Sequence, residues 1–188
     1  MVYGDSLSAS YGIDPKDGWV SLLQAKLGPD GITVINSSIS GETTRGGLNR
    51  IKTDLARIKP DLVVLALGAN DGLRGLPIAE MRNNLQSIIG IIKAVNVRVV
   101  LIGIQIPPNY GIEYAQQFHD LYFHLARNNH MPPPPFLLEG IADKLELFQA
   151  DRLHPKAEAQ PAILENVLPV IRKGLGSRPP AAKAPARS

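Results

Sequence analysis

Short apolar runs of strand length alternate along this chain with longer segments of helical periodicity. The apolar runs fall at residues 32–35, 62–67, 97–104 and 136–138. Between the first two runs, apolar residues recur at the spacing of one buried helix face: Leu48, Ile51, Leu55 and Ile58. This alternation predicts an α/β fold in which a roughly five-stranded parallel sheet is covered by helices on both faces.

Further helices are expected after the second run and towards the end of the chain. They are predicted at residues 78–92, 19–27, 114–128 and 157–172, the last with Pro161 in its first turn. In a sheet of this kind, ligands bind outside the carboxyl ends of the strands. Three polar or turn-forming segments follow strand ends and are expected to converge there: 4–6, 68–71 and 106–110.

The first strand is unusually short, because only Val2 and Tyr3 precede Gly4. A mean strand has about 5 to 6 residues. We therefore expect either a truncated chain or a stunted strand. In a central position, such a strand would leave backbone groups of its neighbours unpaired.

The charge distribution argues against nucleic acid as a partner. The chain has 20 basic and 17 acidic residues, and five of the basic ones lie in residues 172–188, which hold no acid. The remainder is therefore slightly acidic. We predict a single domain at residues 1–174, followed by a disordered basic tail rich in Pro and Ala at 175–188. No run approaches the ~18 apolar residues of a membrane span, so no integral membrane association is expected.

A serine near the start of the chain and a histidine near its end supply the groups of a nucleophilic site. Ser6 lies in the tetrapeptide GDSL at residues 4–7, and His154 follows Asp151 by three residues. A hydroxyl becomes a nucleophile when an imidazole takes its proton and a carboxylate orients that imidazole. We therefore interpret the chain as a serine hydrolase in which these three side chains are catalytic.

Each of these signals has a plainer explanation when taken alone. Ser6, expected to lie between a strand and a helix, could cap that helix, and Asp151 with His154 could form a surface turn. Asn70 lies in a sequence typical of a turn, or donates to an oxyanion. Gly41 offers an N–H to the same oxyanion, or a helix is capped through Ser40 or Thr43. The other histidines are spaced unlike metal ligands, so we expect no metal site: His119, His124 and His130.

Taken in order, four blocks of the chain resemble the SGNH, or GDSL, hydrolase family. The blocks are GDSL at 4–7, ISGET at 39–43, GANDG at 68–72 and DRLHP at 151–155. Chance agreement of all four is unexpected. The chain looks most similar to the bacterial arylesterase and multifunctional thioesterase I/lysophospholipase branch, through GANDGLRG at 68–75 and IPPNYG at 106–111.

The resemblance implies a flavodoxin-like three-layer α/β/α fold with Ser6 as nucleophile, His154 as base and Asp151 as its partner. The oxyanion hole would consist of the N–H groups of Ser6 and Gly41 and the side chain of Asn70. A mobile loop is implied at residues 73–80. The implied substrate-binding residues are Asp71, Gly72, Leu73, Ile106, Pro107 and Pro108. One departure is Arg152, where the family usually has Gly; a positive φ there would cost roughly 1 kcal/mol.

The implied activity is hydrolysis of short- to medium-chain acyl or aryl esters through an acyl-serine intermediate, with thioesters and lysophospholipids as further candidates. No metal or organic cofactor is needed, and the expected partner is a small ester bound by a monomer. Two alternatives stay open: a carbohydrate O-deacetylase, and a binding module that keeps the fold without turnover. The chain begins without a secretory signal, so its compartment stays open, although relatives are often periplasmic or secreted.

Overall fold

The computed structural model describes residues 1–176. Residues 177–188 of the predicted basic tail lie outside this range. The tail does not begin at residue 175, because Leu175 is the last residue of the final helix.

Three parallel strands form the central sheet: β1 (Val2–Gly4), β2 (Leu62–Ala66) and β3 (Arg98–Leu101). Their order is β1-β2-β3, and Gly4 of β1 is paired with Ala66 of β2. Every residue of β2 is buried, as expected for a parallel strand covered on both faces. Since the strands run in the same direction, their carboxyl ends share one edge of the sheet.

Two of the predicted strands do not form, so the described residues make a sheet of three strands rather than five. Asn36 bridges Val2, and Phe136 bridges Gly103, both in parallel. The run 32–35 has few residues of β1 beside it to pair with, because β1 begins only at Val2. The run 136–138 follows four prolines, which have no N–H to donate to a neighbouring strand.

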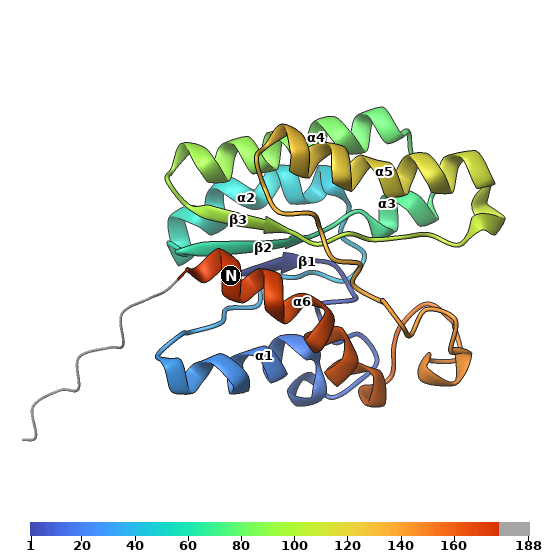
Figure 1. The fold of residues 1–188 in the computed structure, drawn as a ribbon, viewed down its shortest axis with the longest axis horizontal. Helices are drawn as coiled ribbons and strands as arrows, with labels where there is room; N and C mark the ends of the chain where they lie inside the picture. The colour runs from blue at the N-terminus through green and yellow to red at the C-terminus, as the bar shows by residue number, and fades with distance from the viewer. Residues whose placement is uncertain (177–188) are drawn as a thin grey trace, which may run out of the picture.

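Helices cover both faces of the sheet (Figure 1). On one face lie α1 (Trp19–Leu27) and α6 (Gln160–Leu175). On the other face lie α2 (Thr44–Ile58), α4 (Ile78–Ala94) and α5 (Ile112–Asn128), with the short α3 (Ala69–Leu73) beside them. None of the helices in the described residues has the length and apolar character needed to cross a bilayer.

The helical predictions hold closely where the apolar stripe is long. The bounds of α1 match the prediction, and Pro161 lies in the first turn of α6, which follows a 3₁₀ helix at Ala157–Ala159. Thr43 caps α2, since its Oγ1 accepts the N–H of Gly46 at 3.2 Å. One expectation is wrong: Ser6 precedes a series of turns, not a helix, and the first helical residues are the 3₁₀ segment Pro15–Asp17.

The segment after β2 is a helix and not the predicted turn. Gly68 has φ of 125°, a conformation that side chains rarely adopt, and α3 begins at the next residue. A Cβ on Gly68 would also lie 2.3 Å from the Tyr122 hydroxyl oxygen. The predicted mobile loop at 73–80 is consequently shorter, because α3 ends at Leu73 and α4 begins at Ile78.

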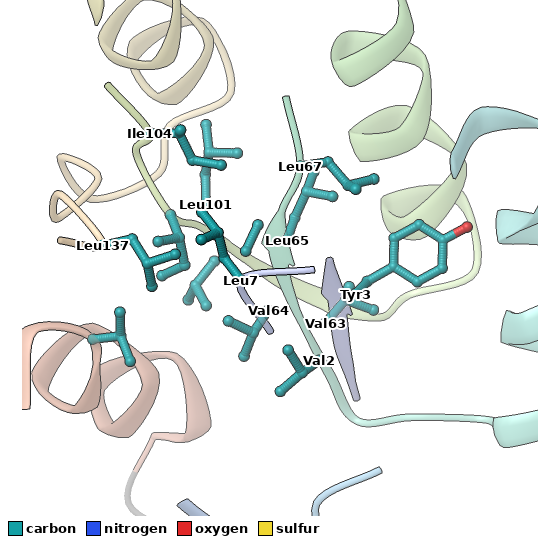
Figure 2. Close-up of a cluster of buried hydrophobic side chains, with 14 of the residues drawn as sticks. Val2, Tyr3, Leu7, Val63, Val64, Leu65, Leu67, Leu101, Ile104 and Leu137 are labelled. Carbon is teal, nitrogen blue, oxygen red and sulfur yellow. The ribbon is translucent and has the colours of Figure 1, made fainter. Parts of the chain in front are cut away.

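Tyr3 anchors the short first strand in the core (Figure 2). Its hydroxyl donates to the carbonyl of Gly47 in α2 at 2.7 Å, and the Arg50 guanidinium lies 4.0 Å from its ring centroid. Burial raises the pKa of this hydroxyl. These contacts join β1 to a neighbouring helix, so β1 does not depend on strand pairing alone.

A cavity of about 600 Å³ lies at the amino end of β1. Its lining includes Met1, the run 32–35 and the start of β2. The Met1 ammonium donates to the Leu62 carbonyl at 2.8 Å, and desolvation lowers its pKa to about 6. A desolvated amino group and the weakly paired run 32–35 therefore border this cavity.

We expect four apolar residues added before Met1 to raise the melting temperature by about 3 °C or more. The added strand would fill the cavity, pair with the run 32–35 and move the ammonium into water. A Gly/Ser extension of equal length is the matched control, because it moves the charge but buries little apolar surface. Calorimetry giving an unchanged or lower melting temperature for the apolar extension would contradict this explanation.

Candidate active site

Ser6 lies two residues beyond β1, at the carboxyl edge of the sheet. The chain turns sharply here, because the carbonyl of Asp5 accepts the N–H groups of Ser8 at 3.1 Å and Ala9 at 2.9 Å. The Asp5 side chain accepts the Leu7 N–H at 3.0 Å. The turn leaves Ser6 partly exposed between two buried neighbours.

A short loop ahead of α6 carries the carboxylate and the imidazole. Asp151 Oδ1 accepts the N–H groups of Leu153 at 2.9 Å and His154 at 3.1 Å, while Oδ2 lies 2.7 Å from His154 Nδ1. Phe148 and Pro155 form an antiparallel bridge that closes the loop. One carboxylate thus fixes both the backbone and the ring of His154.

The structure brings all three predicted catalytic side chains together. His154 Nε2 lies 2.9 Å from Ser6 Oγ, although 148 residues separate them in the chain. An ionised carboxylate only accepts hydrogen bonds, so Nδ1 carries the ring proton and Nε2 is left to accept the Ser6 hydroxyl. This tautomer is the one that removes a proton from a serine.

Asp151 remains ionised throughout the working range of such a site. Desolvation acts to raise its pKa, but the hydrogen bonds from the Leu153 N–H and from His154 outweigh this effect and hold the pKa at about 2. The carboxylate can therefore orient the imidazole at any pH near neutrality.

Arg152, between the two predicted catalytic residues of this loop, adopts the conformation anticipated for a glycine there. Its φ is 58°, in the left-handed region, and its N–H donates to the Gln149 carbonyl at 2.9 Å. A non-glycine residue in this region costs roughly 1 kcal/mol. Arg152 therefore has a strained backbone where the family usually has Gly. The loop nevertheless keeps Asp151 and His154 at hydrogen-bond distance.

The predicted oxyanion donors lie on neighbouring segments. Asn70, in α3, lines the same cavity as Ser6, and its amide nitrogen donates to the Glu42 carbonyl at 3.0 Å. Gly41 lies next to that carbonyl, exposed, with φ of 79°. Arg74 donates to the Gly41 carbonyl at 3.3 Å. Two contacts thus tie the Gly41 loop to α3, while the role of each donor stays a prediction.

A mostly apolar cavity of about 450 Å³ opens beside Ser6 and His154. Three of the predicted substrate-binding residues line it: Leu73, Ile106 and Pro107. A further part of its lining was not predicted and comes from the segment ahead of the catalytic loop, through Phe136, Leu138, Ala142 and Phe148. The sequence analysis predicted residues 136–138 only as a strand, and no spacing in the segment marks it as part of a binding cavity. Pro108 begins the 3₁₀ helix Pro108–Tyr110, and its role stays a prediction.

Asp71 and Gly72 do not line this cavity. The buried Asp71 carboxylate accepts the backbone N–H of Thr44 at 2.9 Å and its hydroxyl at 2.6 Å. Asn84 donates to the same hydroxyl at 3.1 Å. A Cβ on Gly72 would lie 2.6 Å from the Phe118 ring, so this residue serves close packing. Asp71 therefore attaches α3 to the start of α2, and Gly72 lets α3 pack closely against Phe118. Neither residue contacts the cavity.

The remaining histidines lie apart from this site. His119 and His124 are in α5, and His130 follows it. Within residues 1–176, no group of three or more His, Cys, Asp or Glu side chains is arranged to hold a metal ion.

A hydroxyl, an imidazole and a carboxylate joined in series at the edge of a parallel sheet define the class of serine hydrolases. The chain belongs to the GDSL-like lipase/acylhydrolase family, whose model matches residues 2–161. The predicted family and the α/β fold are thereby confirmed.

Individual relatives cover most of this chain and most of their own length. Esterase TesA of Pseudomonas aeruginosa is 45% identical over 92% of this chain and 87% of its own length. An arylesterase of Vibrio mimicus is 46% identical, with coverages of 93% and 88%. The psychrotrophic esterase EstA from Pseudoalteromonas sp., solved in a form inhibited by monoethylphosphonate, is 40% identical with a TM-score of 0.88, over 94% of this chain and 97% of that one.

A fully buried carboxyl group precedes the serine. The pKa of Asp5 is raised to about 7, chiefly by burial; the hydrogen bond from the Leu7 N–H opposes the rise, and the nearby charge of Asp71 contributes to it. Asp5 Oδ2 and the buried Ser8 hydroxyl have no hydrogen-bond partner among the described residues. Because the unfolded side chain ionises near pH 4, folding becomes less favourable as the pH rises from about 4 to about 7.

Asp5→Asn is therefore expected to gain stability relative to the wild type as the pH rises. The folded wild type holds a proton that the unfolded chain has released, and the amide has no such penalty. Urea denaturation at about pH 4.5 and about pH 8 measures the difference, with the exposed Asp30→Asn as control. A difference that is the same at both pH values would rule out the raised pKa.

Proposed function

We propose that this chain is a serine esterase that hydrolyses carboxylic esters through an acyl-Ser6 intermediate. The observation that carries the proposal is the hydrogen-bonded series Ser6–His154–Asp151 at the mouth of an apolar cavity, with distances of 2.9 Å and 2.7 Å. The relatives named esterase and arylesterase support the same reaction class.

In the first half-reaction, His154 Nε2 takes the Ser6 proton while Oγ attacks the ester carbonyl carbon. The carbonyl π electrons move to its oxygen and form a tetrahedral oxyanion. When the carbon–oxygen double bond re-forms, the bond to the leaving alcohol breaks, and His154 returns its proton to that oxygen. The ionised Asp151 stabilises the transient imidazolium without taking a proton.

In the second half-reaction, water replaces the alcohol. His154 takes a proton from the water as its oxygen attacks the acyl-Ser6 carbonyl carbon. Collapse of the second oxyanion releases the carboxylic acid, and the proton returns from His154 to Ser6 Oγ. The enzyme is restored, and neither half-reaction consumes a cofactor.

The N–H groups of Ser6 and Gly41 and the amide of Asn70 are proposed to stabilise both oxyanions. Asn70 lines the cavity next to Ser6, and its bond to the Glu42 carbonyl uses one of its two amide hydrogens. The second hydrogen remains available for an oxyanion. Preorganised donors of this kind act mainly in the transition state, where the charge develops.

The cavity favours an acyl chain over a sugar. Its volume of about 450 Å³ is within the range of about 300 to 1,000 Å³ typical of small-molecule sites. Its walls are mostly aliphatic, which supports short- to medium-chain acyl or aryl esters as substrates. A carbohydrate O-deacetylase is not favoured by this lining, and the intact contacts of Ser6 and His154 argue against a binding module without turnover.

We expect turnover of p-nitrophenyl acetate, butyrate and octanoate to exceed release of acetate from acetylated xylan. Ser6→Ala should lower kcat for these esters by on the order of 10⁴-fold or more, because the nucleophile is lost. Ser87→Ala, on the exposed face of α4, is the matched control. A fluorophosphonate probe should label the wild type at Ser6 and leave the Ala variant unlabelled. Near-wild-type turnover in Ser6→Ala would exclude this serine.

Asn70→Ala is expected to lower kcat by roughly 10²- to 10³-fold with little change in KM, because an oxyanion donor acts chiefly in the transition state. Steady-state kinetics with p-nitrophenyl butyrate measure both constants, and the exposed Asn83→Ala serves as control. A rise in KM at unchanged kcat would instead make Asn70 a substrate-binding residue.

A further inference from the structure

The side chain of Gln149 joins the two ends of the chain that form the site. Its amide nitrogen donates to the carbonyl of Tyr11 at 2.8 Å and to the carbonyl of Pro155 at 3.3 Å. Tyr11 lies in the turns that follow Ser6, and Pro155 directly follows His154. A single amide group therefore contacts both the segment of the nucleophile and the segment of the base.

The backbone of Gln149 holds the catalytic loop as well. Its N–H donates to the His154 carbonyl at 2.8 Å, and its carbonyl accepts the Arg152 N–H at 2.9 Å. The loop between these contacts is exposed at Asp151 and carries the strained Arg152. Gln149 thus closes this loop through two backbone hydrogen bonds.

Tyr11 adds a contact with the imidazole itself. Its ring centroid lies 4.4 Å from that of His154, with the planes tilted by 41°. The Tyr11 N–H also lies 3.4 Å from the Ser6 carbonyl, so the ring is tied to the turn of the nucleophile. The imidazole is held by Asp151 from its own loop and by Tyr11 from the other end of the chain.

The residue after Tyr11 leaves room for the Gln149 amide. Gly12 has φ of 73°, and a Cβ at this position would lie 2.1 Å from Gln149 Oε1. A side chain at position 12 would therefore displace the Gln149 amide from its present place, and the positive φ also favours glycine there.

We propose that Gln149 and Tyr11 are positioning residues that form a clasp between the Ser6 turn and the His154 loop. The proposal rests on the esterase function proposed above. The bond between Ser6 and His154 must break and re-form in every cycle, so it cannot by itself keep the two groups in register. The clasp keeps them within proton-transfer distance while that bond is open, and a misplacement of about 1 Å can cost about 10²-fold in rate.

The test replaces the amide by an apolar side chain of similar size. Gln149→Leu is expected to lower kcat for p-nitrophenyl butyrate by about 10- to 100-fold with KM within about twofold, because the cavity is unchanged but the alignment is lost. The rate of fluorophosphonate labelling should fall in parallel. Gln117→Leu, on the exposed part of α5, is the matched control, and Gln149→Met replaces the Leu variant if that variant does not fold.

The ring contact is tested separately, because Gln149 binds only the backbone carbonyl of Tyr11. Tyr11→Leu keeps that hydrogen bond and removes the ring, so kcat is expected to fall by about 10-fold. Tyr11→Phe is expected to restore most of the loss, since it returns the ring without the hydroxyl. Melting temperatures measured on each variant separate these effects from a loss of folded protein.

The outcomes distinguish the clasp from the function on which it rests. A wild type that labels normally, with a Gln149→Leu variant that labels equally fast, would overturn the clasp alone. A change confined to KM, or a loss of rate that only follows the unfolded fraction, would overturn it as well. A wild type that neither labels nor hydrolyses esters would overturn both proposals.

Discussion

The pairing of β1 with β2 is the contact on which the rest of the site depends. Gly4 pairs with Ala66, so the chain leaves the sheet at the same edge on both strands. Ser6 then follows two residues after one strand, and Asn70 follows four residues after the other. Only three residues form β1, and Tyr3 strengthens its attachment through contacts with α2. The position of the nucleophile is therefore determined by a very small number of backbone and side-chain contacts.

Two buried carboxyl groups next to the site fix α3 and the serine turn through hydrogen bonds. The Asp71 carboxylate accepts two hydrogen bonds from Thr44 at the start of α2, and these fix α3 against that helix. Asp5 fixes the Leu7 N–H while burial raises its pKa. Burying two carboxyl groups near one another is unfavourable, and such arrangements persist where geometry matters. We interpret both as part of the preorganisation of Ser6 and Asn70.

Much of this architecture could be predicted from the sequence, because long apolar stripes and short-range motifs carry their own signal. The bounds of α1 and the pairing of Asp151 with His154 depend on neighbours in the sequence, and both predictions held. The strand predicted at 32–35 failed because its pairing depends on residues of β1, which is too short. The helix α3 was missed because its five residues, which include Gly72, are too few to show a helical period. The clasp could not be predicted, since Gln149 meets Tyr11 only after the whole domain has folded.

The 148-residue separation of Ser6 from His154 has a consequence during protein synthesis. The nucleophile leaves the ribosome early, and the base leaves only when most of the domain has been made. Domains generally fold as units, so a nascent chain carries a serine with nothing to activate it. Ester hydrolysis can begin only after translation has passed residue 154. A growing polypeptide therefore carries an unactivated serine until almost all of its residues have been joined.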